Sequence, residues 1–585
     1  MASAFTQSAV RQPFNACRST VDRATLSFLD FRLKTAKEKP FNSIELMKHI
    51  LVSLLSFVAL ATTATHAANS SRPNIVFIFA DDWGWGDLSC HGHPWLKTPN
   101  LDRLASEGTD FQQFNVLNPV CSPSRTAVMT GHYPARYSVH QHFAAPEQNH
   151  ARGMPDWLDP KAPTLPRFLK QAGYRTAHFG KWHLTNRNTQ GAPKPAAYGY
   201  DEASVFNGGA EWPSADLHAT AANTVAFIKA SHGNPFFINA WLHESHTPHV
   251  PTAESMERWK HLDAQKQVYA AVITDGDNAV GKILDALKTA GVADNTIVMF
   301  SSDNGPESTA AKAGPKKRDL DANVTGYDTY YSSGETGGLR GRKRSLFEGG
   351  VRVPFIVRWP SHTPPGVKNN TTAFTAVDLL PTLCAAAGVT LPAEYRGDGE
   401  NLLAAFEGKP IPRSRPIFWD WQGKSAEPDW WPRLAVREGD WKLAMTADGA
   451  RVELHRLTED RAEAKDVAKE HPDIVARLKK LALAWKATLP AKPNPECLST
   501  QPTSVKPTKS ETAPKDSAVT PKVRGKSFER WDTNKDGILT LDEYKAAPRR
   551  EVVQAAGLPQ NASRRHARLG QTPAEPSTPP NDPVR

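Results

Sequence analysis

Polar and ionisable side chains follow four short segments in the first part of this 585-residue chain. The segments cover residues 75–79, 174–179, 236–242 and 296–301, and each is expected to form a strand. The side chains that follow them are Asp81 and Asp82; Lys181 and His183; His243, Glu244 and His246; and Asp303 and Asn304. Ligands of open α/β sheets bind beyond the carboxyl ends of the strands. One such motif is compatible with a surface turn, but four at one sheet edge indicate a site.

The oxygen donors of this set indicate a cation. Asp81, Asp82, Asp303 and Asn304 offer oxygen atoms only, which hard cations such as Ca²⁺ or Mg²⁺ prefer and zinc does not. Three carboxylates packed together would also repel one another strongly without a cation. The alternative is that the two segments are ordinary turns, because Asp and Asn are common turn residues.

The elements that would position these residues alternate between strands and helices up to about residue 400. Helices are expected over 99–107, 165–172 and 268–290, with Thr98-Pro99 opening the first and Gly108 closing it. This alternation predicts a mostly parallel sheet covered on both faces. From about 410 to 490, short strands followed by an amphipathic helix over 472–489 predict a small antiparallel sheet with one helix.

The segment Cys121-Ser122-Pro123-Ser124-Arg125, followed by Thr130-Gly131, matches the pattern C-x-P-S-R-x-x-x-x-T-G. With it, the chain resembles the type I, formylglycine-dependent sulfatases, in the arylsulfatase and N-acetylgalactosamine-6-sulfatase branch. Further segments resemble the family in the family's order, at 81–87, 98–104, 180–183, 246–248, 303–305, 339–343 and 348–354. The resemblance covers about 71–490. It implies an alkaline-phosphatase-like α/β sandwich with a mostly parallel central sheet, plus a small C-terminal antiparallel subdomain.

The resemblance also implies a role for each matched residue. A formylglycine-generating maturation enzyme would oxidise Cys121 to formylglycine (3-oxoalanine), whose hydrated aldehyde attacks sulfur and whose second hydroxyl expels sulfate. Ca²⁺ would be held by Asp81, Asp82, Asp303, Asn304 and the modified Cys121. The remaining catalytic candidates are Arg125, which holds the formylglycine; Lys181 and Lys343, which contact sulfate; His183, the base; and His246, the acid that protonates the leaving alcohol.

Two further residues are candidates for substrate binding. Arg342 stands where the family often has glycine before the lysine, and with Arg344 it forms a basic cluster that could meet a second anionic group. His249 lies three residues after His246 and is the other candidate.

The ends of the chain differ in composition from the segment between them. Residues 47–68 have the charged start, apolar run and small residues of a secretory signal peptide, so residues 1–46 are expected to be an over-extended start. The apolar run is too short for an integral membrane span, which predicts a secreted or periplasmic protein. The sulfatase catalytic domain is expected at 69–405, the antiparallel subdomain at 406–490, a Pro/Lys/Thr-rich linker at 491–525 and a disordered basic tail at 548–585.

Residues 526–547 are expected to form a single EF-hand-like module. The loop begins at Asp532, and Gly537 stands at its sixth position. The expected ligands of this second calcium site are Asp532, Asn534, Asp536, Ile538 through its carbonyl, Thr540 and Glu543. EF-hands usually pair, so the alternative is a decayed loop that binds nothing.

Charge and cysteine content exclude several classes of function. The net charge of +10 arises at the two ends of the chain, since residues 69–490 are almost neutral, so a nucleic-acid partner is not indicated. Five cysteines without a CxxC pair argue against a zinc ribbon and a disulfide scaffold. The leading hypothesis is a sulfatase acting on a sulfated carbohydrate or aryl sulfate. The alternatives are a phosphate or phosphonate monoester hydrolase and a non-catalytic, calcium-dependent glycan-binding protein.

Overall fold

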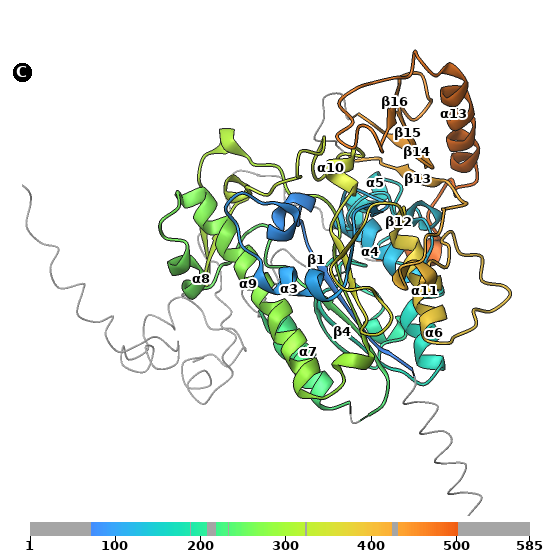
Figure 1. The fold of residues 1–585 in the computed structure, drawn as a ribbon. Coiled ribbons are helices and arrows are strands. Elements are labelled where there is room, and N and C mark those ends of the chain that lie inside the picture. The colour runs from blue at the N-terminus through green and yellow to red at the C-terminus, as the bar shows by residue number, and fades with distance from the viewer. Residues whose placement is uncertain are drawn as a thin grey trace, which may run out of the picture. The chain divides into compact units, whose positions relative to one another are not determined.

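An eight-stranded sheet forms the centre of the larger, N-terminal part of the described chain (Figure 1). The computed structural model describes residues 72–500 apart from 188, 208–217, 232, 322–323 and 424–430. In spatial order the strands are β11 (Val367–Asn369), β2 (Thr109–Phe111), β10 (Phe355–Arg358), β7 (Thr296–Ser302), β1 (Asn74–Ala80), β6 (Phe236–Trp241), β4 (Arg175–Lys181) and β5 (Glu202–Phe206). Only β10 runs antiparallel to its neighbours, so the sheet is mostly parallel, as expected.

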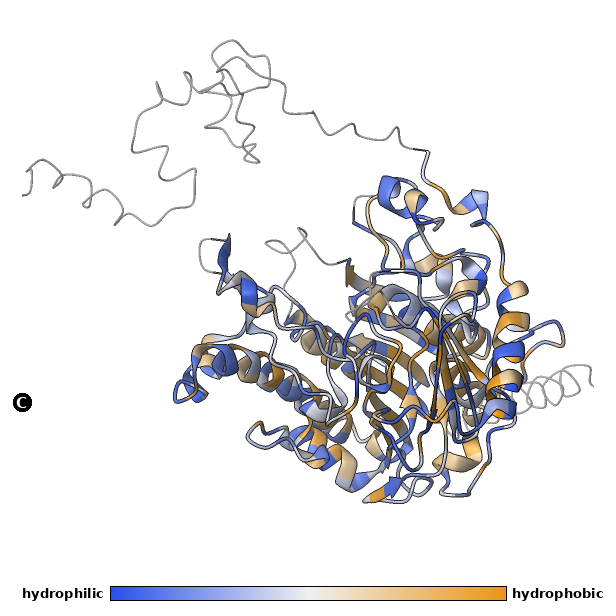
Figure 2. Ribbon diagram, turned by 90° about the horizontal axis from the view of Figure 1, so that it is seen from above, coloured by the Kyte–Doolittle hydropathy of each residue, from blue (hydrophilic) through white to orange (hydrophobic). Residues whose placement is uncertain are grey.

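Both faces of this sheet are covered by helices, which is why β1 is buried along its whole length. Val76 and Ile78 belong to one apolar cluster, with α3 (Pro99–Glu107), α7 (Ala219–Lys229) and α9 (Ala264–Thr289). Phe77 and Phe79 belong to the other, with α4 (Cys121–Thr130), α6 (Leu165–Gln171) and α11 (Leu379–Ala386). Figure 2 shows hydrophobic residues along the central strands. The alternation of side chains along each strand therefore creates two helix-covered layers.

A second, four-stranded sheet follows this larger part. Its order is β13 (Ile417–Asp420), β14 (Leu434–Glu438), β15 (Trp441–Met445) and β16 (Val452–Arg456), antiparallel throughout, with α13 (Pro472–Ala487) packed against it. Trp419, Val436 and Leu443 join the same apolar cluster as Phe77 and Phe79. The small sheet thus packs directly on the layer that contains α4.

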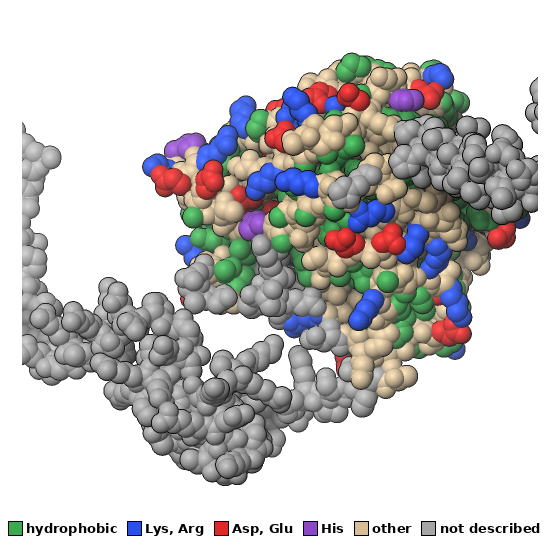
Figure 3. Space-filling view, turned by 90° about the horizontal axis from the view of Figure 1, so that it is seen from below, with side chains coloured by type: hydrophobic (Ala, Val, Ile, Leu, Met, Phe, Trp, Pro, Cys, Tyr) green, Lys and Arg blue, Asp and Glu red, His purple; other side chains and the backbone are tan. Residues whose placement is uncertain are grey.

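Short elements complete the described chain. Two small sheets pair β3 (Phe114–Asn115) with β12 (Phe374–Thr375), and β8 (Lys317–Asp321) with β9 (Val324–Tyr327). The remaining helices are α5 (Pro146–Ala151), α8 (Ala253–Arg258), α10 (Glu348–Val351) and α12 (Leu403–Phe406). None of the helices in the described part combines the length and apolarity that crossing a bilayer requires. On the face drawn in Figure 3, acidic and basic side chains are interspersed.

The predicted elements agree with the structure within a few residues, and one predicted boundary differs from it. Residues 491–500, expected to begin the linker, instead pack on the larger part: the Asp156 backbone N–H donates to the Cys497 carbonyl (2.8 Å), and the Asp156 carboxylate accepts the Ser499 N–H (2.7 Å). Cys497 is buried, so this stretch has a packed partner despite its prolines. The predictions for residues 1–46, the signal peptide at 47–68, the EF-hand at 526–547 and the tail at 548–585 fall outside the described residues.

Candidate active site

The predicted site residues lie where four central strands end. Asp81 and Asp82 follow β1, Lys181 ends β4, His243 and His246 follow β6, and Asp303 and Asn304 follow β7. Since these strands are parallel, their ends meet at one edge of the sheet. Asp82 and His183 have positive φ angles of 62° and 48°, a conformation that non-glycine residues seldom adopt outside functional sites.

Three carboxylates converge at this edge. Oxygen atoms of Asp81, Asp82 and Asp303 lie within 4.8 Å of one another, and all three side chains are buried. Asp303 Oδ1 accepts the Asp82 N–H (3.1 Å), and Asn304 Nδ2 donates to Asp82 Oδ1 (2.7 Å). The strand ends therefore assemble the predicted oxygen donors into one cluster.

The three carboxylates have unequal electrostatic surroundings. Burial raises the pKa of Asp303 well above its ordinary value. The neighbouring Asp81 carboxylate raises it further, whereas the Arg125 guanidinium lowers it. Burial also raises the pKa of Asp82, with Lys343 opposing. Burial would raise the pKa of Asp81 too, but Lys181, His246 and Arg125 hold it well below the usual range. Ionisation is thus favoured at Asp81 and opposed at Asp82 and Asp303.

Two oxygen atoms of the cluster fit a bound cation. Asp81 Oδ1 and Asn304 Oδ1 are buried, and neither has a hydrogen-bond partner among the described residues. A buried acceptor without a donor is costly, and here both belong to the set of ligands predicted from the sequence. All donors are oxygen, so the residues fit Ca²⁺ or Mg²⁺ better than zinc.

Cys121 is the first residue of α4 and faces a histidine. Its buried Sγ lies 3.1 Å from His183 Nδ1, and His183 Nε2 lies 3.1 Å from the Phe143 carbonyl. A carbonyl only accepts, so Nε2 carries the proton and Nδ1 presents its lone pair to Cys121. Burial, aided by Lys181, lowers the pKa of His183 to about 3, which keeps the ring neutral. His183 is therefore arranged to accept a proton from residue 121.

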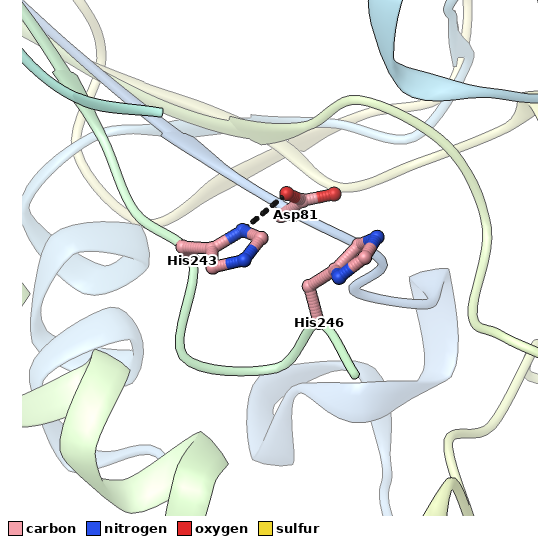
Figure 4. A group of neighbouring side chains, drawn as sticks. All are labelled: Asp81, His243 and His246. Atoms are coloured by element: carbon pink, nitrogen blue, oxygen red, sulfur yellow. Dashed lines mark hydrogen bonds and ion pairs between the residues drawn. The ribbon is translucent and has the colours of Figure 1, made fainter. Parts of the chain in front are cut away.

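His246 and His243 lie beside Asp81 (Figure 4). His243 Nδ1 donates to Asp81 Oδ2 (2.7 Å), and the two imidazole rings stack with centroids 4.7 Å apart. His246 Nδ1 donates to the Thr247 carbonyl (2.7 Å), which leaves Nε2 as an acceptor 3.8 Å from Asp82 Oδ2. Burial and Lys181 lower the pKa of His246 well below its ordinary value. It can deliver a proton only after Nε2 has taken one up.

Three cations surround the carboxylates. Arg125 Nη2 lies 2.7 Å from Asp303 and 3.4 Å from Asp81, with its guanidinium over the Trp241 ring (4.9 Å). Lys181 pairs with Asp81, and Lys343 Nζ donates to Asp82 Oδ2 (2.6 Å). The donors of Arg125 are thus directed at the carboxylates and the Lys181 carbonyl, whereas the sequence resemblance implied contact with residue 121.

Arg342 and His249, the two candidates for substrate binding, contact other parts of the protein. Arg342 donates to the Gly334 carbonyl. His249 is fully buried, its Nε2 lies 3.0 Å from Ser332 Oγ, and its backbone pairs with Tyr327. The Nε2 atom of His249 is therefore engaged by the protein itself rather than presented to a ligand.

Two residues to which the sequence analysis assigned no role belong to the site. His243 holds Asp81, and Glu307 lies 3.4 Å from Lys343 while also pairing with Arg344. His243 comes two residues after β6, and Glu307 comes four residues after Asp303. Polarity just after a strand had singled out His243 without giving it a role, and the same rule extended a few residues beyond β7 would have included Glu307.

Comparisons with known proteins agree with this geometry. The family model "Sulfatase" matches residues 73–389, and "N-sulphoglucosamine sulphohydrolase, C-terminal" matches 337–487. Human N-acetylgalactosamine-6-sulfatase is 33% identical over 394 residues, which cover 59% of this chain and 68% of the relative. The N-acetylgalactosamine-6-O-sulfatase of Bacteroides thetaiotaomicron is 26% identical over 74% of this chain and 99% of its own.

Solved structures show the same fold. The crystal structure of Ps i-CgsB in complex with k-i-k-neocarrahexaose has a TM-score of 0.60 and 26% identity, and the match covers 71% of this chain and 92% of that one. The fold is thus the alkaline-phosphatase-like fold of the sulfatases, with its mostly parallel central sheet and small antiparallel sheet. The chain belongs to the sulfatase family, whose members are sulfuric ester hydrolases.

Proposed function

We propose that this protein hydrolyses a sulfate ester of a sulfated carbohydrate, with Cys121 converted to formylglycine as the nucleophile and Ca²⁺ bound beside it. One observation carries the proposal. Cys121 begins a helix next to the carboxylate cluster, with the lone pair of His183 Nδ1 3.1 Å from its sulfur. A structural thiol needs neither a proton acceptor nor a cation site next to it.

Asp81, Asp82, Asp303 and Asn304 would hold the cation, and Asp81 Oδ1 and Asn304 Oδ1 are the atoms still lacking a partner. When bound, Ca²⁺ acts as a Lewis acid that polarises a sulfate oxygen, and the formylglycine aldehyde supplies, on hydration, the attacking hydroxyl. The family implies both groups.

The side chains around residue 121 have complementary roles. His183 Nδ1 accepts a proton from the residue at position 121, because its other nitrogen is committed to the Phe143 carbonyl. Lys181 and Lys343 bring positive charge to the site, where they stabilise the charge that develops on sulfate. The Arg125 guanidinium holds the Asp303 carboxylate in place through a contact of 2.7 Å.

His246 serves as the general acid for the departing alcohol. Its ring is only partly buried, with 22% of the side chain exposed, so it can reach a ligand. Because Nδ1 is bound to the Thr247 carbonyl, the proton it donates must sit on Nε2. His243 keeps this ring stacked beside Asp81.

The relatives support a glycan as substrate. Two carry N-acetylgalactosamine-6-sulfatase in their names, and a third was solved with a neocarrahexaose. We extend only the shared class to this chain: a sulfated sugar, with aryl sulfates as small surrogates. A formylglycine-generating enzyme would act on Cys121, and export through the 47–68 segment would make the protein secreted or periplasmic. Calcium binding by the loop from Asp532 to Glu543 stays a prediction.

The test uses the full chain co-expressed with a formylglycine-generating enzyme. Sulfate release from a panel of sulfated glycans is measured beside phosphate release from matched phosphate esters, with Cys121→Ala as the control. Sulfate release that is lost in Cys121→Ala supports the proposal. Faster phosphate release would favour the phosphate or phosphonate monoester hydrolase. Glycan binding that depends on calcium, with no release of either anion, would favour the non-catalytic alternative.

A further inference from the structure

A buried lysine of the small sheet contacts the loop that carries Lys343. Lys442 lies on β15 and has no exposed surface. Its Nζ lies 2.8 Å from Glu348 Oε1, 3.0 Å from Glu463 Oε1 and 2.9 Å from the Leu346 carbonyl. Burying a charged lysine is expensive unless several acceptors surround it, as they do here. The small sheet therefore directs the buried Lys442 ammonium at Glu348, Glu463 and the Leu346 carbonyl.

The contacted segment is compact, and residues 339–350 are called the Lys343 loop below. The Lys343 N–H donates to the Pro306 carbonyl (3.1 Å), and the Arg344 N–H donates to the Pro119 carbonyl (2.9 Å). Gly305 packs so closely on the loop that a Cβ there would lie 1.9 Å from the Gly349 carbonyl oxygen. One side of the loop is thus tied to the segments that carry Asp303 and Cys121.

The other side is tied to the small sheet. Besides Lys442, Arg340 Nη1 lies 2.7 Å from Glu453 Oε2 on β16, with its guanidinium 3.6 Å from the centre of the Phe347 ring. Glu463, after β16, also accepts the backbone N–H of Glu348. The loop is held between the two parts of the protein, with Lys343 between the anchors.

We infer that Lys442 is a positioning residue, through which the small sheet places the Lys343 ammonium beside Asp82. The inference rests on the role proposed above for Lys343. Lys442 touches no candidate catalytic side chain, so it acts only through the loop. A displacement of about 1 Å in a positioned group can cost about 100-fold in rate, so an anchor five residues or fewer from Lys343 matters for turnover.

The main test is Lys442→Met in the full, matured chain, because the Met side chain is similar in length to that of Lys and carries no charge. We expect kcat/KM for an aryl sulfate to fall about 10- to 100-fold, with conversion of Cys121 unchanged by mass spectrometry. The matched control is Arg413→Met, which removes another buried cation, 2.5 Å from Asp378. The control should lower Tm to a similar extent and leave kcat/KM unchanged. Equal kinetic losses in both variants would overturn the inference.

A double-mutant cycle then separates this inference from the proposed function. If Lys442 acts through Lys343, Lys442→Met should have little further effect on kcat/KM in a Lys343→Ala background. The same fold-loss in both backgrounds would contradict the positioning role. Wild-type kcat/KM in Lys343→Ala alone would instead contradict the function proposed for Lys343.

A gentler variant covers the case in which Lys442→Met does not fold. Glu463→Gln keeps the Lys442–Glu348 ion pair and removes the charge of the second carboxylate that Lys442 contacts. It should lower kcat/KM several-fold in the wild-type background and not in Lys343→Ala. A folded Glu463→Gln with wild-type kinetics would overturn the inference.

Discussion

Two buried clusters of charge, one at the active site and one at the Lys343 loop, differ in how their charges are balanced. Glu348 is surrounded by Lys442, Arg352 and Arg437: burial opposes its ionisation, but these cations hold its pKa well below the ordinary value. Its partner Glu463 has a raised pKa, mainly because of burial. At the active site, burial and Asp81 raise the pKa of Asp303 well above the ordinary value.

The difference distinguishes a cluster built for stability from one built for a ligand. Glu348 obtains its counter-charges from the protein itself, through contacts of 2.5 Å to Arg352 and 2.8 Å to Lys442. Asp82 and Asp303 have raised pKa values, and Asp81 Oδ1 and Asn304 Oδ1 next to them lack donors, whereas Glu463, the acid with a raised pKa in the first cluster, lies 3.0 Å from the Lys442 ammonium. A cation from solution would complete the second cluster and is not needed by the first.

Neutralising one acid in each cluster should have opposite effects on stability. Asp303→Asn should raise the Tm of the calcium-free protein, because it removes a carboxylate whose ionisation is opposed in the fold, while Arg125 keeps Asp81 at 3.4 Å. It should also lower turnover about 1,000-fold. Glu348→Gln should instead lower the free energy of unfolding by about 3–5 kcal/mol. Thermal unfolding in EDTA decides this, and a lower Tm in both variants would remove the distinction.

His246→Ala should lower kcat about 100-fold for a sulfated sugar, whose alcohol is a poor leaving group. The loss should be much smaller for an aryl sulfate with a low leaving-group pKa, since that group departs without a proton. Lys343→Ala is the matched control, and it should impair both substrates alike. Equal losses on the two esters in His246→Ala would argue against its role as the acid.

In the calcium-free protein, the stability contributed by Asp82 and Asp303 should fall as the pH rises, opposite in sign to that of Asp81, whose pKa is lowered. Asp82 and Asp303 have raised pKa values in the fold, so the folded state binds more protons than the unfolded chain, and their contribution falls above about pH 4. Glu348 has the opposite sign: its contribution is present above about pH 4 and is lost below it. Unfolding with and without calcium across this range should show a calcium effect that grows with pH. A calcium effect independent of pH would contradict this.

Removing the C-terminal region should have the smallest effect, provided that the packed residues are kept. Deleting 501–585 should change kcat/KM for an aryl sulfate less than twofold, because the described site lies entirely before residue 350. Deleting 491–585 should lower Tm further, since it removes buried Cys497 and the contacts to Asp156. Large activity loss in the shorter deletion would give the C-terminal region a role in catalysis.

Sequence patterns predicted the strand ends because local signals control them. Apolar runs followed by Asp81-Asp82 and Asp303-Asn304 are readable from composition and turn chemistry, and parallel pairing then brings them together. The Cys121 segment carried its own specific pattern. Fold class and most of the site follow from these features.

The choice of partner for each side chain was not predictable in this way. His249 is engaged by Tyr327 and Ser332, which lie in a long polar stretch without a strong strand pattern. Arg342 is committed to a backbone carbonyl, and residues 491–500 find packing partners despite their linker-like composition. These outcomes depend on tertiary contacts between distant segments, which local patterns do not encode.

The central claim is that residue 121 acts as formylglycine, and it can be measured directly. Trypsin should release the peptide 104–125, which contains this position. In active preparations the account predicts a peptide that has lost sulfur, gained a carbonyl oxygen and reacts with a hydrazide probe. Activity should rise in proportion to the fraction converted, and Cys121→Ser should be inactive without a serine-oxidising maturation enzyme. Full activity from protein whose position 121 is entirely free thiol would contradict the account.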